Sequence, residues 1–484
     1  MRKIFLSLAV LTIAVAANAF ELRMQNSDLG VNKSITTAAD DPDFFGDGKV
    51  QVTFDAENKV IDVYFDNATL KGTNANELFY FMADANYTNV MLHLKGANQM
   101  IGAGDYSKPI YVAGTPDGKV RGTLGIVAED PATAALEISS KTMVIQLNYN
   151  ASMAVGATLT GDAFYFIIKT TSASQPVFYG GGGESTTQLL WFMTANLDIT
   201  ATENNQVTKD LESFAIAAAI RTEGVTIEGA NLVKDGAPYK GSLKAVYPYP
   251  IKVGDTWMYP DVPFAPAELK SGTINYNSVA REVALDNVEI DGALTIYNDN
   301  AYIALKGNNK FTNTTNKSYE RIGFVGTHCG IFGDKDATLS INGNDLTDGI
   351  YASDGLEIKG FKKLTIEAVK KGIEGSSSTK ETDVLKLYSV PMEIKAADGA
   401  IVDFENLLMG ATDVEWSPAA SYNATKKALV DVDDNILNEV ALTKKAALEQ
   451  ILNGKTVNGK FIHNGQLFIE RNGEIFNATG ARVK

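Results

Sequence analysis

The sequence contains few of the side chains that most often carry nucleophilic or metal-binding chemistry. Its 484 residues include one cysteine, Cys329, and three histidines, His93, His328 and His463. A single cysteine excludes an internal disulfide and a zinc site built from cysteines. Three scattered histidines argue against a metalloenzyme or a histidine-based hydrolase. We therefore expect no metal site and no cofactor.

Positive charge is also scarce. The chain has 43 lysine and arginine residues against 58 aspartate and glutamate residues, so its formal charge is 43 − 58 = −15. Nucleic-acid binding needs basic patches that displace counterions, and this charge balance argues against it. Hydrophobic residues make up 45% of the chain and charged residues 21%, which is typical of a globular protein.

The one long apolar run lies at the N-terminus. Residues 1–19 read MRKIFLSLAVLTIAVAANA, with Arg2 and Lys3 ahead of an apolar stretch and a small-x-small site at 17–19. This pattern is typical of a secretory signal peptide, and an uncleaved anchor is the alternative. Because no later run reaches about 18 apolar residues, we expect no transmembrane segment in the mature chain. Cleavage near Ala19 predicts a secreted, extracellular or outer-cell-surface protein.

Two blocks of the sequence occur twice in the same order. Residues 60–72 (VIDVYFDNATLKG) match 281–292 (REVALDNVEIDG), and residues 90–98 (VMLHLKGAN) match 301–309 (AYIALKGNN). Ordered matches at similar offsets indicate a tandem duplication. We predict a first β module at 20–245, a second at 246–440, and a short helix plus a C-terminal β-hairpin tail at 441–484.

The local pattern within these modules favours strands. Val90, Leu92 and Leu94 alternate with polar residues, and Leu-x-Ile phrases begin at Leu339, Leu356 and Leu364. The 17 residues from Leu339 to Leu356 suit one coil of a β-solenoid. We predict an all-β fold of two tandem, duplicated parallel β-solenoid (β-helix-like) modules, with two β-sandwich domains as the alternative. Short helices are expected at 211–221 and 443–453.

Several phrases resemble a known module. They are Tyr249-Pro-Ile-Lys-Val-Gly254, Val283-Ala-Leu-Asp-Asn287 and residues 301–309 in the second copy, and Tyr64-Phe-Asp-Asn-Ala-Thr-Leu70 in the first. They are similar to a repeated module of secreted proteins from anaerobic Gram-negative gut and oral bacteria. The resemblance implies a parallel β-solenoid with a carbohydrate-binding or adhesin-like role.

The last 26 residues, 459–484, resemble the short C-terminal tails of exported proteins from the same bacteria. Asn464-Gly465 and Asn472-Gly473 are hairpin turn signals between alternating strands. In some relatives such tails direct secretion across the outer membrane. The alternative is a small β-meander that caps the solenoid.

Three motifs suggest chemistry but are better explained structurally. His328 and Cys329 are neighbours, and strand neighbours point to opposite faces, so we expect no dyad. Asp334-Lys-Asp336 is typical of a turn. Residues 431–435 (DVDDN) are acidic like a calcium loop, but Ile436 and Leu442 stand where an EF-hand has Gly and Glu. We predict a hairpin turn there, with arms at 428–430 and 436–437.

We also expect an exposed side chain at His93, on the outward side of its strand.

Aromatic residues provide the remaining candidate site. Four of them cluster among prolines at the junction of the two copies, and a fifth lies in the first copy: Tyr247, Tyr249, Trp257, Tyr259 and Trp191. Exposed tyrosine and tryptophan rings can stack on sugars; the alternative is that they pack the junction.

We therefore expect a secreted or cell-surface, non-catalytic binding or adhesion protein that contacts glycans or host or bacterial surfaces. A polysaccharide lyase or glycoside hydrolase on a β-helix, and a structural spacer, are the alternatives.

Overall fold

The computed structural model describes residues 20–483, except for 74–76, 106–107, 157–161, 173, 182–186, 315–323, 328, 344–346, 446–458, 464–465, 472–473 and 478–480. The described residues form strands and no helix, which confirms the prediction of an all-β fold. The sheets mix parallel and antiparallel pairs. Within the described part of the chain, no helix is long and apolar enough to span a membrane. The predicted signal peptide, residues 1–19, lies outside the described residues.

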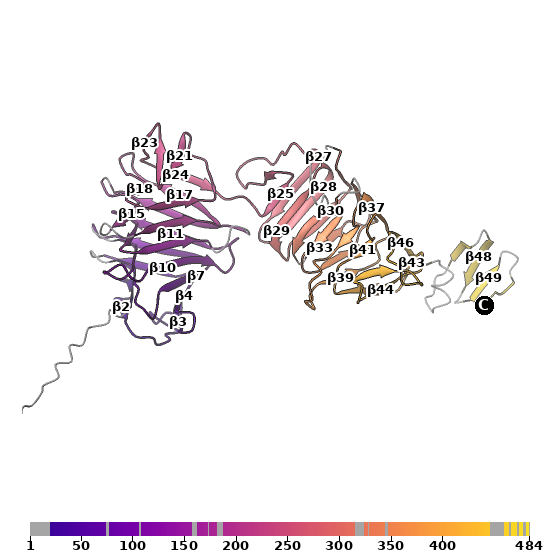
Figure 1. Ribbon diagram of the computed structural model, residues 1–484, viewed down its shortest axis with the longest axis horizontal. Coiled ribbons are helices and arrows are strands. Elements are labelled where there is room, and N and C mark those ends of the chain that lie inside the picture. The colour runs from indigo at the N-terminus through magenta and orange to yellow at the C-terminus, as the bar shows by residue number, and fades with distance from the viewer. Residues whose placement is uncertain are drawn as a thin grey trace, which may run out of the picture. The chain divides into compact units, whose positions relative to one another are not determined.

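The chain divides into two compact units, Met1–Pro248 and Tyr249–Lys484 (Figure 1). In the first unit, each strand from β4 to β16 pairs in parallel with the strand three places later in the chain. The strands therefore form three parallel ladders.

The first ladder contains β4 (Val60–Asp66), β7 (Asn89–Lys95), β10 (Gly122–Ala128), β13 (Ala151–Val155), β16 (Gln188–Phe192) and β19 (Ser213–Ile216). The second contains β5 (Thr69–Gly72), β8 (Ala97–Gly102), β11 (Ala135–Ser140), β14 (Phe164–Thr170) and β17 (Ala195–Thr200). The third contains β6 (Phe79–Met82), β9 (Ile110–Ala113), β12 (Ile145–Asn148), β15 (Phe178–Gly181) and β18 (Thr208–Lys209).

Antiparallel strands complete the first unit at both ends of these ladders. They are β1 (Glu21–Asn26), β2 (Val31–Ile35), β3 (Val50–Asp55), β20 (Ala219–Ile220), β21 (Val225–Glu228), β22 (Asn231–Lys234), β23 (Ala237–Pro238) and β24 (Leu243–Val246). Alternation places one side of each strand in the core. In β4, for example, Ile61, Val63 and Phe65 are buried and the residues between them are half-buried.

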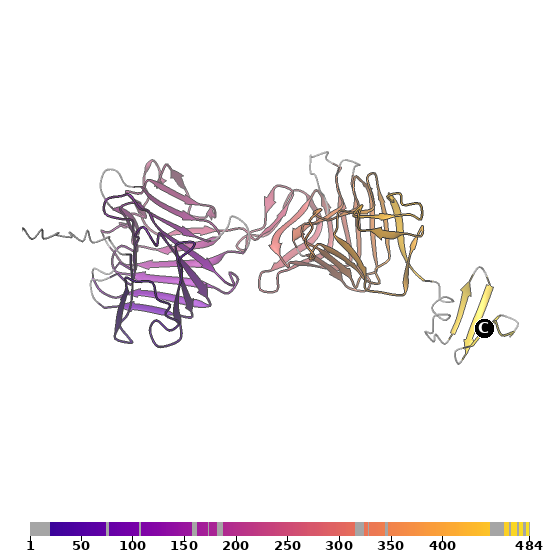
Figure 2. The same ribbon diagram turned by 60° about the horizontal axis from the view of Figure 1, so that its bottom comes forward.

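The second unit, orange in Figure 2, repeats this pairing rule. Each strand from β29 to β39 pairs in parallel with the strand three places later, and the long strand β28 (Glu282–Asp291) pairs with both β30 and β31. Its first ladder contains β29 (Leu294–Asp299), β32 (Phe324–Thr327), β35 (Ile350–Ala352), β38 (Ile373–Glu374) and β41 (Ile401–Val402). The second contains β30 (Tyr302–Lys306), β33 (Cys329–Gly333), β36 (Leu356–Lys359), β39 (Val384–Leu387) and β42 (Asn406–Met409). The third contains β31 (Asn308–Thr312), β34 (Thr338–Asn342), β37 (Lys363–Val369) and β40 (Met392–Ala396).

Antiparallel strands flank these ladders too. They are β25 (Ile251–Val253), β26 (Thr256–Trp257), β27 (Leu269–Asn277), β43 (Val414–Ser417), β44 (Ser421–Asn423), β45 (Ala428–Val430) and β46 (Glu439–Lys444). The C-terminal tail forms its own antiparallel sheet from β47 (Gly459–His463), β48 (Gln466–Arg471) and β49 (Glu474–Asn477). The two predicted turn dipeptides fall between these strands, outside the described residues.

The helix predicted at 211–221 is wrong. Residues 213–216 form β19, which pairs in parallel with β16, and Phe214 is buried in the core of the first unit. An exposed sheet edge with an apolar face overrides the helix propensity of the alanine-rich segment. Of the helix predicted at 443–453, the first two residues belong to β46, and residues 446–453 lie outside the described residues.

The predicted 17-residue coil is also wrong. Leu339 pairs with Leu364, which lies 364 − 339 = 25 residues later, and Leu364 pairs in turn with Met392. Leu356 belongs to a different ladder and pairs with Cys329 and Leu385. The recurring Leu-x-Ile phrase therefore marks two separate ladders, and the distance between consecutive phrases is not the length of a repeat.

The duplicated blocks form the same corner in each unit. In the first unit, Asp66 pairs with Lys95 on the neighbouring strand, and in the second, Asp286 pairs with Lys306. Asn67 and Asn287 have positive φ values of 50° and 52° at the end of this contact. The glycines that follow the lysines, Gly96 and Gly307, also have positive φ values, of 66° and 65°. The repeated sequence thus encodes a repeated turn geometry.

Candidate ligand-binding site

A row of outward-facing side chains runs along the third ladder of the first unit. Backbone pairing places six residues of successive strands at one register position: Arg23, Tyr80, Tyr111, Gln146, Tyr179 and Lys209. The neighbours of Tyr80 in sequence, Phe79 and Phe81, are fully buried, so the alternation of the strand turns Tyr80 outward. The parallel pairing thus gathers side chains that lie far apart in the sequence.

The first three residues of this row stack on one another. The rings of Tyr80 and Tyr111 lie 5.0 Å apart between centroids and 11° from parallel, and the Arg23 guanidinium lies 4.5 Å from the centre of the Tyr80 ring. Burial raises the pKa of Tyr80 to about 12 and raises the pKa of Tyr111 as well. Both hydroxyls therefore keep their protons at neutral pH.

An amide network continues the row. The amide groups of Gln146 and Asn148 lie 2.9 Å apart, and the amide of Asn148 lies 2.7 Å from the Tyr111 hydroxyl. Gln146 is only 8% exposed, and its Oε1 atom has no hydrogen-bond partner among the described residues. A buried amide atom without a partner is costly, because it has lost its water and gained nothing in return. A ligand that supplies this hydrogen bond would recover that cost.

A cavity of about 590 Å³ opens beside Gln146 and Tyr179. It lies where three consecutive turns stack, between β8 and β9, β11 and β12, and β14 and β15. Its described lining consists of Asp105, Lys108, Lys141, Thr142, Met143, Gln146, Ser172, Ser174, Gln175 and Tyr179. Its volume is in the usual range for sites that bind small molecules, about 300–1,000 Å³.

Buried polar residues hold the turns of this cavity in place. The Asn205 side chain, 1% exposed, donates to the backbone carbonyls of Ser172 at 3.1 Å and Gln175 at 2.6 Å. The Thr170 hydroxyl donates to the Thr142 carbonyl at 3.2 Å, which ties two of the turns together. A site whose backbone is already fixed loses little entropy when it binds a ligand.

Several polar groups of the lining remain unused. The side chains of Ser174, Gln175 and Tyr179 make no hydrogen bond to any residue that the structure describes. The Tyr179 ring also makes no ring or cation contact there, unlike Tyr80 and Tyr111. The cavity therefore offers an aromatic ring, hydroxyls and amides to a polar ligand.

The aromatic residues predicted as a site lie on different elements of the two units. Trp191 lies on β16 in the first ladder, is 40% exposed, and its Nε1 donates to the Ser213 hydroxyl at 3.2 Å. Tyr247 is buried in the core of the first unit and is 7% exposed.

The other three belong to the second unit. Tyr249 packs edge-on against Tyr276 at 4.9 Å, and Trp257 lies 5.2 Å from Tyr297 at 30°. Tyr259 is half-buried. Trp257 with Tyr297, which is 42% exposed, is therefore the accessible aromatic pair near the predicted junction cluster.

The other candidate chemistry is occupied by structural contacts. His93 is not simply exposed: its ring stacks on Tyr64 at 4.5 Å and its Nε2 lies 2.8 Å from Asp62. Cys329 is buried, and His328 lies outside the described residues. The Asp334 carbonyl accepts a hydrogen bond from the backbone N–H of Ala337 at 2.8 Å, which closes a turn. Within the described residues, no group of three or more His, Cys, Asp or Glu side chains could hold a metal ion.

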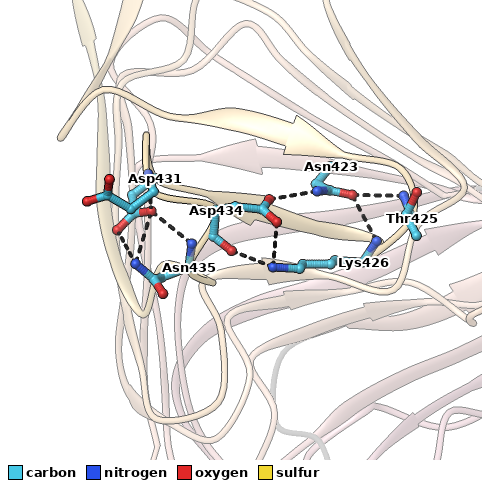
Figure 3. Close-up of polar contacts among 7 residues, drawn as sticks. Asn423, Thr425, Lys426, Asp431, Asp434 and Asn435 are labelled. Carbon is cyan, nitrogen blue, oxygen red and sulfur yellow. Dashed lines mark hydrogen bonds and ion pairs between the residues drawn. The ribbon is translucent and has the colours of Figure 1, made fainter.

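The acidic segment 431–435 forms the predicted hairpin turn (Figure 3). Asp431 Oδ1 accepts hydrogen bonds from the backbone N–H groups of Asp433 at 2.9 Å and Asn435 at 2.8 Å. The Asp434 carboxylate pairs with Lys426 at 2.7 Å. Val430 and Ile436 pair across the turn. The carboxylates are thus used by backbone donors and a lysine.

A second polar cluster lies in the second unit. Lys371 contacts Glu374 and Asp403, each at 2.7 Å, and Asp354 accepts from Lys380 at 3.2 Å and Thr382 at 2.6 Å. Burial lowers the pKa of Lys371, but the carboxylates of Asp403 and Glu374 outweigh it and raise that pKa overall. Carboxylates already neutralised by lysines are poor candidates for an acid and base pair in polysaccharide cleavage.

Sequence reasoning missed the row of side chains along the third ladder, of which Gln146 and Tyr179 line the cavity. The signal was a Tyr or Gln between two apolar residues in Phe79–Phe81, Ile110–Val112, Ile145–Leu147 and Phe178–Gly180. The spacing is uneven, because 111 − 80 = 31, 146 − 111 = 35 and 179 − 146 = 33.

The sequence matches no protein-family model, and neither a curated protein nor a solved structure is significantly similar to it.

Proposed function

We propose that this chain is a secreted or cell-surface, non-catalytic protein that binds glycans in the cavity beside Tyr179. The observation that carries this proposal is the combination of an uncommitted tyrosine ring with a buried amide that lacks a partner, in one cavity. Sugars present both C–H faces, which pack on aromatic rings, and hydroxyls, which bond to amides and hydroxyls. The signal-like residues 1–19 support export of the chain.

We further propose that both units are β-solenoids, as the resemblance to secreted proteins of anaerobic Gram-negative bacteria implies. The pairing of each strand with the strand three places later supports this architecture. Such stacking also explains the site, because it repeats one turn position in three successive coils and so builds a cavity from adjacent turns.

Binding of a glycan array by the purified full chain is the first test. Tyr179→Ala should weaken binding to any glycan that the chain selects by about tenfold, because the ring contact is lost. Tyr179→Phe keeps the ring and should lose less. Tyr165→Ala is the matched control, since Tyr165 is 49% exposed on β14 and does not line the cavity.

Four outcomes would contradict the proposal. If Tyr179→Ala and Tyr165→Ala behave alike, the cavity is not the site. If Trp191→Ala or Trp257→Ala alone abolishes binding, one of the predicted aromatic residues is the platform instead. Turnover of a polysaccharide by the purified chain would establish an enzyme, and a chain that binds no glycan would favour a structural spacer.

A further inference from the structure

One lysine of the cavity differs from most other half-buried lysines that the structure describes. Six of these lysines lie within 4.0 Å of a carboxylate: Lys33, Lys71, Lys252, Lys363, Lys371 and Lys427. Lys108 is half-buried as well, but no carboxylate among the described residues lies within that distance. Its Nζ lies 5.8 Å from the centre of the Tyr111 ring.

This arrangement is unusual in a chain with a formal charge of −15, where carboxylates outnumber cations. In the six other lysines an opposite charge accompanies the ammonium group. The other charged residues of the cavity do not supply that charge. Asp105 lies 3.4 Å from Lys141, and both of these side chains are exposed.

We infer that the cavity binds an acidic glycan, and that Lys108 pairs with the carboxylate or sulfate of the sugar. The inference rests on the proposed function and names the ligand class of the same site. Tyr179 and Gln146 would hold the sugar ring, and Lys108 would select the charged substituent. A hydrogen bond between two charged groups is stronger and more selective than one between neutral groups.

The test compares polymers that differ only in charge. Polygalacturonate and its methyl ester share one backbone, as do dextran sulfate and dextran. The purified full chain should bind at least one charged polymer about tenfold more tightly than its neutral counterpart. Preference for polygalacturonate would identify a carboxylate as the ligand group, and preference for dextran sulfate would identify a sulfate.

The variant Lys108→Met removes the charge and keeps an apolar stem. It should weaken binding of the preferred charged polymer by about tenfold and leave binding of the neutral counterpart unchanged. It should also reduce the dependence of affinity on salt concentration. Lys119→Met is the control for net charge, because Lys119 is 82% exposed and does not line the cavity.

The results separate this inference from the proposed function. If the chain binds neutral glycans equally well and Tyr179→Ala weakens that binding, the glycan site stands and the role of Lys108 is refuted. If Lys108→Met and Lys119→Met weaken charged polymers equally, the attraction is nonspecific and the inference fails. If Tyr179→Ala weakens the binding of no polymer, both the proposed glycan site and the role of Lys108 are refuted.

Discussion

The side-chain oxygen of Asn98 accepts a hydrogen bond from the backbone N–H of Ala68 at 2.8 Å. Its Nδ2 donates to the carbonyls of Lys95 and Gly96 at 3.2 and 3.1 Å. Asn309 repeats this arrangement in the second unit, accepting from Val288 at 3.1 Å. Both asparagines are 1% exposed. One buried side chain thus satisfies the polar backbone of a whole corner in each unit.

Replacing either asparagine should destabilise its own unit. Asn98→Ala leaves the buried backbone N–H of Ala68 without its acceptor, whereas the carbonyls of Lys95 and Gly96 keep hydrogen bonds from the backbone. The free energy of unfolding should therefore fall by about 2 kcal/mol. Urea denaturation combined with hydrogen exchange of the strand amides measures the loss and assigns it to a unit. Asn32→Ala, at an exposed strand position, is the control. An Asn98→Ala chain as stable as this control would refute the role of the corner.

Gly96, two residues before Asn98, should not tolerate a side chain for two reasons: its positive φ value and the close approach of Asn67. Gly96 has a φ of 66°, and a Cβ there would lie 2.4 Å from Asn67 Oδ1. Gly236 is the control for backbone strain, because it has a φ of 74° but no atom within 4 Å of such a Cβ. Gly236→Ala should therefore cost about 1 kcal/mol from backbone strain alone, and Gly96→Ala clearly more. Equal losses in thermal unfolding of the two variants would show that the contact with Asn67 has no effect.

Alternation and duplication made much of the fold predictable. Residues 90–94 show a period of two, and the two copies of the Lys-Gly-x-Asn phrase form equivalent corners. These signals are local, since each depends on residues that are close in the sequence. The helix at 211–221 was predicted wrongly because its alanines favour a helix only while no strand partner is present, and β16 provides one.

The cavity could not be predicted in the same way. Tyr111, Gln146 and Tyr179 meet only through the pairing of β9, β12 and β15, and the turns between these strands differ in length. A fixed repeat length would have aligned them in the sequence, and irregular turns remove that alignment. The predicted aromatic residues were close in sequence instead, and the structure places Tyr247 in a core and Trp191 on another ladder.

Gly181 should be required for the amide network of the cavity. A Cβ at this position would lie 2.2 Å from Asn148 Oδ1 and 3.1 Å from Gln146 Nε2. Gly181→Ala should therefore displace both amides and weaken binding of the selected glycan by about tenfold, by analogy with the loss of one good hydrogen bond. Binding is measured by calorimetry. The exposed Gly229→Ala, with no atom within 4 Å of its Cβ, is the control and should bind normally.

Asp117 should keep its charge at unusually low pH. The Thr115 hydroxyl donates to this carboxylate at 2.6 Å and the Lys119 backbone N–H at 3.2 Å, and these bonds lower the pKa of Asp117 to about 2. Because the pKa is lower in the folded chain than in the unfolded chain, the contribution to stability is present above about pH 4 and is lost as the pH falls toward 2.

Thr115→Val removes the strongest of these bonds. The pKa of Asp117 should then move back toward its ordinary value of 3.8, and an NMR titration of its carboxyl carbon detects the change. Asp117→Asn should lose the acid-dependent part of stability, with the largest difference from the unmodified chain at neutral pH and the smallest near pH 2. A Thr115→Val chain with an unchanged titration curve would show that the hydroxyl does not set this pKa.

Removal of residues 459–484 should separate export from folding. The buried cores of the two units contain none of the described residues of this tail, and its strands pair only with one another among the described strands. Truncation should therefore leave the unfolding transition of both units within about 0.5 kcal/mol of the full chain. If the tail is a sorting signal, the truncated protein should accumulate inside the cell envelope, as fractionation and immunoblotting would show. Normal export with reduced stability would identify the tail as a structural cap instead, because a cap protects the end of a stacked core whatever route the chain takes.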